Sequence, residues 1–318
     1  MPLEVTVIVP YYNEAKSIKE TLSLVAKQST PAKEVIFVNS SSTDDSFLVV
    51  NDWIKENQAR FVTKFVNIDK STKNPGSSKN IGIKLSKTKW VAFMDCGQKF
   101  KLDWIKDQID FITSHNVDIS FGVVYLEGIN WVDRCSIAQT YGYKRIRSCV
   151  PGTLLNKKVF DTTGLFLEDR RSGYDMIWQS EVRKKIKKYD VNTKSKIKYK
   201  GINFSKTLWG LYKKSVLYSR TVLGLKGYNT PYYYILFLIL LIWIFFSLTK
   251  LLIPILISYI VFRIYLLPIY KSKAITIYKE YPVASIFGLP VTSVIIDIGK
   301  LTGYFFGIYD YLIKKIFR

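Results

Sequence analysis

The chain is poor in the residues that bind zinc or form disulfides. Among its 318 residues there are three cysteines and one histidine, namely Cys96, Cys135, Cys149 and His115. No two of these cysteines stand at Cys-x-x-Cys spacing, whereas zinc sites and disulfide frameworks need their ligands in such groups. We therefore expect neither a zinc site nor a disulfide framework. The cysteine content suits a reducing cytoplasm.

The N-terminus lacks the basic and then apolar pattern of a secretory signal. The chain opens with MPLEVTVIVPYYNE, which mixes acidic residues with a short β-branched run. We therefore expect no signal peptide, and we expect membrane attachment to come from the C-terminal part.

Acidic residues are scarce: 25 Asp and Glu oppose 47 Lys and Arg, which gives a net charge of +22. Such a balance is typical of nucleic-acid-binding proteins, but the position of the charges favours another partner. Twelve basic residues lie between Arg183 and Lys214, and only Asp190 opposes them. Because this block precedes long apolar segments, it suits a surface that meets anionic lipid headgroups. We expect membrane lipids and not nucleic acid as partners; a lysine-rich, solvated surface is the alternative.

Charge is almost absent from two C-terminal segments. Residues 232–249 carry none, and residues 251–270 carry only Arg263. Each segment approaches the roughly 20 residues that a membrane-spanning helix needs, and Lys250 and Pro254 mark a turn between them. The lysines that follow favour the cytoplasmic side for this end of the hairpin. We expect a multi-pass protein of the cell membrane whose catalytic domain is cytoplasmic.

Two further segments are expected to lie at the membrane surface. Residues 283–318 are apolar but contain Pro290 and Asp297. A third span there would place the terminal basic residues outside, so we favour an interfacial or re-entrant helix and keep a third span as the alternative. Over 203–230, basic and apolar residues each recur at seven-residue spacing, which predicts an amphipathic interfacial helix. A surface helix packed on the domain is the alternative.

The first 200 residues alternate short apolar runs with helix-like stretches. The expected strands are 5–9, 34–38, 61–67 and 90–94, and the expected helices are 16–27, 44–57 and 76–86. This alternation predicts an α/β fold with a largely parallel sheet. Ligands of such sheets bind at the carboxyl ends of the strands. Pro10, Asn39 and Asp95 stand at those ends.

Three motifs in this part carry a family resemblance. They read VTVIVPYYNE, EVIFVNSSSTDDS and PGSSKNIGIKLSKTKWVAFMDCG. In order and spacing they resemble the GT-A domain of family-2 glycosyltransferases, over roughly residues 4–200. The resemblance implies a Rossmann-like nucleotide-sugar domain over 1–202, followed by a membrane region over 231–318.

The resemblance also implies which residues meet the nucleotide. Pro10 would turn the chain so that Tyr12 and Glu14 flank the base; a plain strand-to-helix turn, with Glu14 near a helix N-terminus, is the alternative. Similar enzymes carry an acidic residue where Asn39 stands. Asn39 both donates and accepts hydrogen bonds, so a nucleotide contact is still possible. Asp44 we assign mainly to helix capping.

The metal-binding DxD motif of this family corresponds here to Asp95-Cys96-Gly97. A thiol is a poor ligand for a hard cation, so Asp95 is the one metal ligand that remains. One carboxylate with phosphates and water still suits Mg²⁺ or Mn²⁺, and we expect a divalent cation. Lys79 would neutralise phosphate charge, unless it is a solvated lysine. A site that keeps the fold without catalysis is the alternative.

The general base is expected at Asp175, in the acceptor-side segment that resembles the family's. Inverting transfer needs one base to take the proton of the acceptor hydroxyl. Helix capping before residues 176–188 is the other role considered, and Glu168 and Asp169 are rival carboxylates. Arg170 and Arg171 would bind phosphate or lie in an exposed turn.

These observations predict an inverting glycosyltransferase that uses a nucleotide-diphosphate sugar. The expected acceptor is a lipid-linked or envelope saccharide at the cytoplasmic membrane face, because anchoring holds the site beside such a substrate. Transfer to polyprenyl phosphate is a second enzymatic interpretation. A non-catalytic membrane module that binds nucleotide-sugar is the interpretation from another class.

Overall fold

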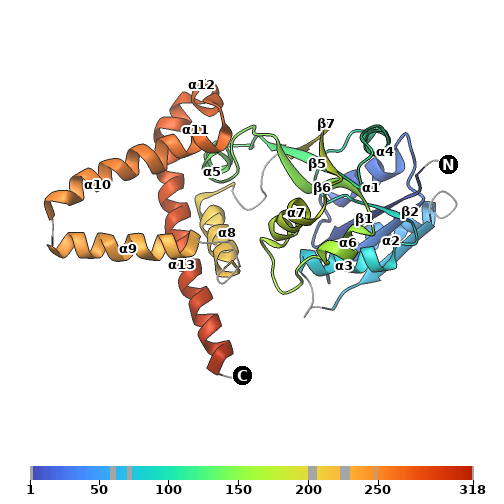
Figure 1. Cartoon of the computed structure of the whole chain (residues 1–318), viewed down its shortest axis with the longest axis horizontal. Helices are drawn as coiled ribbons and strands as arrows, with labels where there is room; N and C mark the ends of the chain where they lie inside the picture. Colours follow the sequence, from blue (N-terminus) through green and yellow to red (C-terminus); the bar gives the residue numbers. More distant parts are fainter. Residues whose placement is uncertain are drawn as a thin grey trace. The chain divides into compact units, whose positions relative to one another are not determined.

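The computed structural model describes residues 3–57, 62–69, 74–199, 206–222, 230–247 and 249–316 (Figure 1). The chain divides into two compact units. Unit 1 comprises Met1–Tyr125 and Ile146–Tyr199, and unit 2 comprises Leu126–Arg145 and Lys200–Arg318. One division lies near residue 200, and residues 126–145 belong to unit 2. The continuous domain expected over 1–202 did not include this excursion.

Unit 1 is built on a seven-stranded sheet with the order β3-β2-β1-β4-β6-β5-β7. β1 is parallel to β2 and β4, and β2 is parallel to β3. β6 is antiparallel to β4 and β5. The prediction of a mostly parallel α/β sheet is therefore confirmed. The strands are β1 Val5–Tyr11, β2 Glu34–Asn39, β3 Val62–Asn67, β4 Trp90–Phe93, β5 Ile119–Leu126, β6 Arg147–Asn156 and β7 Tyr189–Tyr199.

Helices join the strands and cover both faces of this sheet (Figure 1). They are α1 Ile18–Ala26, α2 Ser46–Asn57, α3 Pro75–Leu85, α4 Trp104–His115, α6 Val159–Thr163 and α7 Tyr174–Lys185. The expected helices 16–27, 44–57 and 76–86 match α1, α2 and α3 to within two residues at each end. Of the expected strand 61–67, residue 61 lies outside the described residues.

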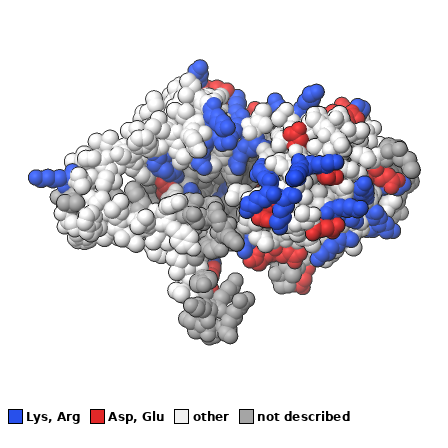
Figure 2. All heavy atoms as spheres, in the orientation of Figure 1, with Lys and Arg blue, Asp and Glu red and all other residues white. Residues whose placement is uncertain are grey.

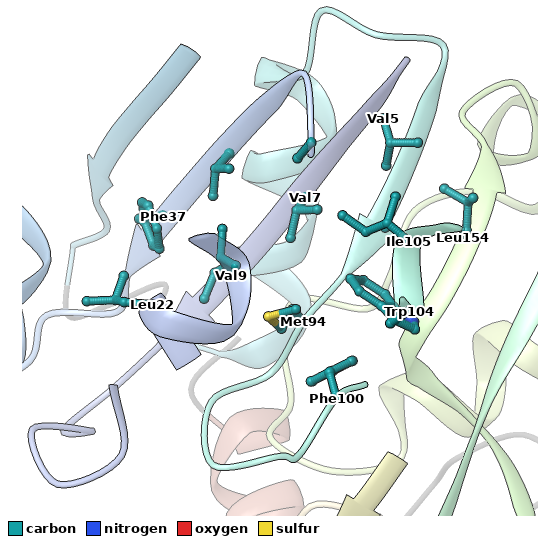
Figure 3. Packing of buried hydrophobic residues seen from close by; sticks show 14 of the residues in the cluster. Val5, Val7, Val9, Leu22, Phe37, Met94, Phe100, Trp104, Ile105 and Leu154 are labelled. Carbon is teal, nitrogen blue, oxygen red and sulfur yellow. The ribbon is translucent and has the colours of Figure 1, made fainter. Parts of the chain in front are cut away.

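Successive side chains of β1 point to opposite faces of the sheet and pack into two apolar clusters. Val5, Val7 and Val9 lie with Leu22 of α1 and residues of α4 (Figure 3). Ile8 belongs to the cluster on the other face, where Gly82 of α3 lies so close that a β-carbon would be 2.4 Å from Ile8 Cγ2. A strand buried on both faces needs a nearly continuous apolar run. The run VTVIV provides it.

Pro10 does not end β1, contrary to the sequence-based expectation. The strand continues to Tyr11, whose carbonyl accepts from Ser40 N at 2.9 Å on the β2 side. Ile8 faces the β4 side, where its carbonyl accepts from Met94 N at 3.0 Å. Pro10 faces that side too and has no N–H to donate. Pairing with β4 therefore stops at Ile8 while pairing with β2 goes on. The order of the strands reverses between β1 and β4, and ligand crevices of such sheets form at this point.

The described elements that lie wholly within unit 2 are helices, and two of its helical stretches are long and apolar enough to cross a membrane. They are Leu252–Ser272, with mean hydropathy 2.1, and Ala284–Asp310, with mean hydropathy 1.5. The apolar helix Pro231–Ser247 is shorter. The elements are α5 Trp131–Thr140, α8 Leu208–Arg220, α9 Thr230–Ser247, η2 Thr249–Leu251, α10 Leu252–Ser258, η3 Tyr259–Leu266, α11 Leu267–Ser272, α12 Thr276–Glu280, η4 Ala284–Gly288 and α13 Leu289–Ile316. The predicted hairpin corresponds to α9 followed by the stretch from η2 to α11, with residue 248 outside the described residues.

The helix predicted over 203–230 is α8, and residues 203–205 and 223–229 lie outside the described residues. α8 packs along α13 at three glycines of that helix. β-Carbons at Gly299, Gly303 and Gly307 would lie 2.7 Å or less from atoms of Ser215, Val216 and Arg220 respectively. The residue numbers of the contacting pairs increase along both helices, so the two helices run in the same direction. Trp209 on α8 is 62% exposed.

Candidate active site

The loops after β1 and β2 are bound to each other at the carboxyl edge of the sheet. Asn13, with a left-handed φ of 54°, donates its backbone N–H to Ser42 Oγ at 3.0 Å. Asp44 Oδ2 accepts from Ala15 N at 3.0 Å, and its Oδ1 accepts from Ser46 N at 3.1 Å. Burial opposes ionisation, but these hydrogen bonds hold the pKa of Asp44 below its usual value. Asp44 thus does more than the predicted capping of α2, because it also joins the two loops.

Glu14 lies partly buried in the first of these loops. Its carboxylate accepts from Ser17 Oγ, and its backbone N–H donates to Ser46 Oγ at 2.7 Å. Burial raises the pKa of Glu14, and the negative charges of Asp95 and Asp44 add to that rise. Glu14 therefore lies within electrostatic reach of Asp95 at the end of β4. Tyr12, two residues earlier, is half-buried in the same loop.

Asn39 at the end of β2 is 3% exposed and is held by neighbouring polar groups. Its Nδ2 donates to Asn67 Oδ1 at 2.7 Å. Its Oδ1 accepts from Ser42 N at 3.0 Å. An amide has two donor hydrogens and two lone pairs, and one of each is used in these bonds. Asn67, at the end of the neighbouring β3, was not predicted, because no motif in the sequence marks it.

Lys79 and Asp95 form an ion pair, with Nζ 2.9 Å from Oδ1. The side chain of Lys79 is 1% exposed and that of Asp95 is 29% exposed. The alternative of a solvated lysine is therefore wrong. Burial disfavours the charged ammonium, but Asp95 outweighs it and raises the pKa of Lys79. Lys79 Nζ also lies 5.7 Å from the ring centroid of Tyr174, which places α3, β4 and the start of α7 around one cation.

The two residues after Asp95 add no second ionised ligand. Burial and then the nearby Glu14 raise the pKa of the Cys96 thiol well above its usual value, so it stays neutral. Gly97 has a left-handed φ of 74°, a conformation that favours glycine. Among the described residues, no three His, Cys, Asp or Glu side chains are grouped to hold a metal ion.

Asp175 lies in the first turn of α7, where Gly173, with φ of 82°, is the N-cap. The helix begins at Tyr174 and ends at Lys185, two to three residues before the expected bounds of 176–188. Because Gly173 is the N-cap, the alternative prediction that Asp175 caps the helix is wrong. Burial raises the pKa of Asp175, and the negative charge of Asp95 adds to that rise. A hydrogen bond from Met176 N and the positive charge of Lys79 oppose it. Asp175, Lys79 and Asp95 therefore share one electrostatic environment.

Cys149 on β6 interacts with the same group, although no sequence motif marks it. Its thiol pKa is raised by burial and by the charges of Asp95 and Asp175. Cys149 is thus within electrostatic reach of both carboxylates. A neutral thiol at this place makes the surroundings of Asp175 less polar.

The rival carboxylates have partners within the fold. Glu168 Oε1 accepts from Asn80 Nδ2 at 2.7 Å, and Asn80 also donates to Phe166 O at 2.8 Å. Asp169 forms an ion pair with Arg170 at 2.6 Å. The bonds of Asn80 fix the segment before α7 against α3. Both rival carboxylates are thus engaged within the fold, whereas the pKa of Asp175 responds to Lys79 and Asp95.

An α/β sheet with charged side chains gathered where its strand order reverses is the arrangement of nucleotide-binding domains. The family model for glycosyl transferase family 2 matches residues 6–165, which is half of the 318-residue chain. The chain belongs to this family. The resemblance read from the three sequence motifs is thereby confirmed.

The named relatives match only part of this chain. The poly(ribitol-phosphate) beta-N-acetylglucosaminyltransferase TarS of Staphylococcus aureus is 28% identical over 130 residues, covering 40% of this chain and 22% of TarS. The UDP-Glc:alpha-D-GlcNAc-diphosphoundecaprenol beta-1,3-glucosyltransferase WfaP of Escherichia coli is 27% identical over 123 residues, covering 39% and 47%. The chain thus spans less than half the length of either relative. The crystal structure of S. aureus TarS 1–349 with UDP-GlcNAc is 19% identical, covers 95% of this chain and 90% of that one, and has a TM-score of 0.49.

Proposed function

We propose that this chain is an inverting glycosyltransferase that moves a sugar from a nucleotide-diphosphate donor to a lipid-linked or envelope saccharide. The observation that carries the proposal is the cluster of Lys79, Asp95 and Asp175 at the point of strand-order reversal. A buried cation and two carboxylates in one electrostatic environment supply both the charge and the base that the transfer needs.

Asp175 is the proposed general base. It takes the proton of the acceptor hydroxyl as that oxygen bonds to the anomeric carbon, and the bond from that carbon to the diphosphate breaks on the opposite face. A base works best when its pKa lies near the working pH. The burial that raises the pKa of Asp175 moves it in that direction.

Stabilisation of the leaving diphosphate is proposed to fall to Lys79 and Asp95 together. Asp95 is a single carboxylate, so a Mg²⁺ or Mn²⁺ ion there would take most of its ligands from the donor phosphates and water. Such an ion would neutralise the charge of the departing diphosphate. Lys79 holds Asp95 Oδ1, and its buried ammonium adds a fixed positive charge at the same place.

The proposed location is the cytoplasmic face of the cell membrane, and packing in unit 2 supports it. α8 runs along the second half of α13 and exposes Lys213 and Arg220, of which Arg220 pairs with Asp310 at 2.6 Å. A helix with this charge is costly to bury in hydrocarbon. The part of α13 beside α8 is therefore proposed to lie at the interface, as expected for residues 283–318, and the α9–α10 hairpin is proposed as the anchor.

The acceptor class is supported by the relatives. One is named for transfer to poly(ribitol-phosphate) and another for transfer to a sugar on diphosphoundecaprenol. Both names describe acceptors of the cell envelope or of a lipid carrier. Direct transfer to polyprenyl phosphate stays the second enzymatic interpretation.

Turnover by the purified full-length chain, measured against a panel of nucleotide sugars, tests the proposal. Asp175→Asn keeps the size of the side chain and removes the base, so kcat should fall by about 10²- to 10⁴-fold. Asp110→Asn is the matched control, because Asp110 is exposed and pairs only with Lys106 at 2.7 Å in the described contacts. Donor binding without turnover in the wild-type chain would instead indicate the non-catalytic module, which the single carboxylate of Asp95-Cys96-Gly97 favours.

A further inference from the structure

Unit 2 contains a charged cluster among its most apolar helices. Arg263 on η3 lies 2.6 Å from Asp297 on α13. The same carboxylate accepts from Tyr234 Oη at 2.6 Å and from Tyr259 Oη at 2.8 Å. Lys300 Nζ lies 3.2 Å from Tyr234 Oη. Ionisable residues inside membrane segments are rare and usually mark a functional site.

Four members of this cluster line one end of a cavity of about 500 Å³, namely Tyr234, Tyr259, Arg263 and Asp297. The walls come from α9, α10 and η3, with Leu240, Ile244, Ile255 and Phe262 among them. The volume lies in the range of small-ligand sites, which are mostly apolar with a few placed polar groups. Figure 2 shows few charged side chains over α9 and α10.

The polarity of the cavity changes along the hairpin. Along the chain, Tyr234 and Arg263 lie more than ten residues from the turn between α9 and α10, whereas Ile244 and Ile255 lie within a helical turn or so of it. Ten residues of helix from Tyr234 to Ile244 span about 15 Å. The cavity is therefore polar at the end where the chain enters the hairpin and apolar toward its tip.

The donors of Arg263 define which headgroup the cavity can take. Arg263 and Asp297 both line the cavity and form an ion pair. The carboxylate is already satisfied by Arg263 and the two tyrosines. A guanidinium has five donor hydrogens, and two of its nitrogens are bound to Gln139 and Asp297. An anion such as phosphate can occupy the remaining positions.

We infer that this cavity binds the polyprenyl phosphate end of a lipid carrier, with the phosphate at Arg263 and the prenyl chain between α9 and α10. This inference rests on the proposed function for the identity of the lipid as the carrier of the acceptor. A polyprenyl phosphate is one apolar chain with one charged end, which matches an apolar cavity that has the Arg263–Asp297 pair at one end.

Native mass spectrometry of the full-length chain in detergent tests the site with undecaprenyl phosphate, undecaprenol and phosphatidylglycerol as probes. The wild-type chain should bind undecaprenyl phosphate about tenfold more tightly than phosphatidylglycerol. Leu240→Trp fills the cavity and should weaken both prenyl probes about tenfold. Ile242→Trp is the matched control, because Ile242 lies on the opposite face of α9 and is 51% exposed; its binding should stay within about twofold.

The headgroup contact is tested by the double variant Arg263→Gln/Asp297→Asn, which removes both charges with little change in shape. It should bind undecaprenol as the wild type does and lose the preference for the phosphate. If the pair only joins helices, the variant unfolds at a lower temperature but keeps that preference. Equal binding of phosphatidylglycerol, or equal effects of Leu240→Trp and Ile242→Trp, would overturn the inference. The assay contains no nucleotide sugar, so its outcome is independent of turnover. A chain that binds none of the prenyl probes but transfers sugar to a water-soluble acceptor would show that this site fails while the proposed function holds.

Discussion

At the scale of single residues, the candidate site depends on how burial and charge oppose each other. Lys79 is buried yet charged because Asp95 lies 2.9 Å away. Asp175 is a carboxylate whose pKa burial raises. The sequence indicated these three residues through the family motifs, but it could not show that Lys79 is buried. Burial of a lysine depends on which strand its helix covers, and that is a property of the tertiary fold.

The pH dependence of activity should report Asp175. The carboxylate must be ionised to accept a proton, so kcat/KM should fall as the pH falls through its raised pKa, at a higher pH than for an ordinary aspartate. Asp95→Asn removes a like charge, which lowers the pKa of Asp175, and the acid limb should move to lower pH. We expect the limb of Asp110→Asn to match the wild type. An acid limb that moves upward in Asp95→Asn would contradict the assignment.

The Lys79–Asp95 pair should show strong coupling in stability. Asp95→Asn leaves an ammonium unpaired at 1% exposure, which should lower the free energy of unfolding by about 3 kcal/mol. Lys79→Met leaves a carboxylate that water still reaches, so its cost should be smaller. The double variant should cost less than the two single changes together, by about 1 kcal/mol or more. Urea unfolding of the detergent-solubilised chain, followed by tryptophan fluorescence, measures all three, and strictly additive values would show that the pair is not coupled.

At the scale of elements, the first four strands and three helices were predictable because each carries its own pattern. Apolar runs such as VTVIV and turn residues at their ends set the boundaries locally. The continuation of β1 past Pro10 was not predictable from β1 alone. β1 can continue because the side of Pro10 that lacks an N–H faces β4, and β4 pairs with β1 only as far as Ile8. The pairing with β2 on the other side is unaffected. The packing of α8 on α13 likewise depends on three glycines that lie about 90 residues away from their partners.

Gly303 should be the sensitive position of the α8–α13 pair. A β-carbon there would lie 2.5 Å from the carbonyl oxygen of Val216, and backbone cannot move aside as a flexible side chain can. Gly303→Ala should therefore destabilise unit 2 by about 1–3 kcal/mol, although alanine favours a helix. Thermal unfolding in detergent measures the change. Ile298→Ala at a 49% exposed site on the same helix is the control, and it should cost less; the reverse order would show that the helices are not closely packed at Gly303.

At the scale of the whole molecule, the sequence predicted a first domain that ends at residue 202 and a membrane region after it. Composition changes sharply near residue 200, where a basic and then apolar region replaces alternating strands and helices. The transfer of residues 126–145 to unit 2 was not predictable in this way. α5 is not long or uniformly apolar, and its place in unit 2 depends on contacts such as Gln139 with Ile264 O at 3.0 Å. Such an excursion leaves no trace in local composition.

Single-cysteine labelling in intact cells should establish the orientation of unit 2. In a chain whose three native cysteines are replaced by serine, Lys250→Cys lies at the hairpin tip and should react with a membrane-impermeant maleimide. Lys273→Cys lies beyond the hairpin and should react only after the cells are opened, because basic residues stay on the cytoplasmic side. Tyr309→Cys, on the part of α13 beside α8, should behave like Lys273→Cys if that part is interfacial. External labelling at residue 309 would mean instead that residues 284–310 form a third span, and Arg220 and Asp310 would then have crossed the membrane as a neutralised pair.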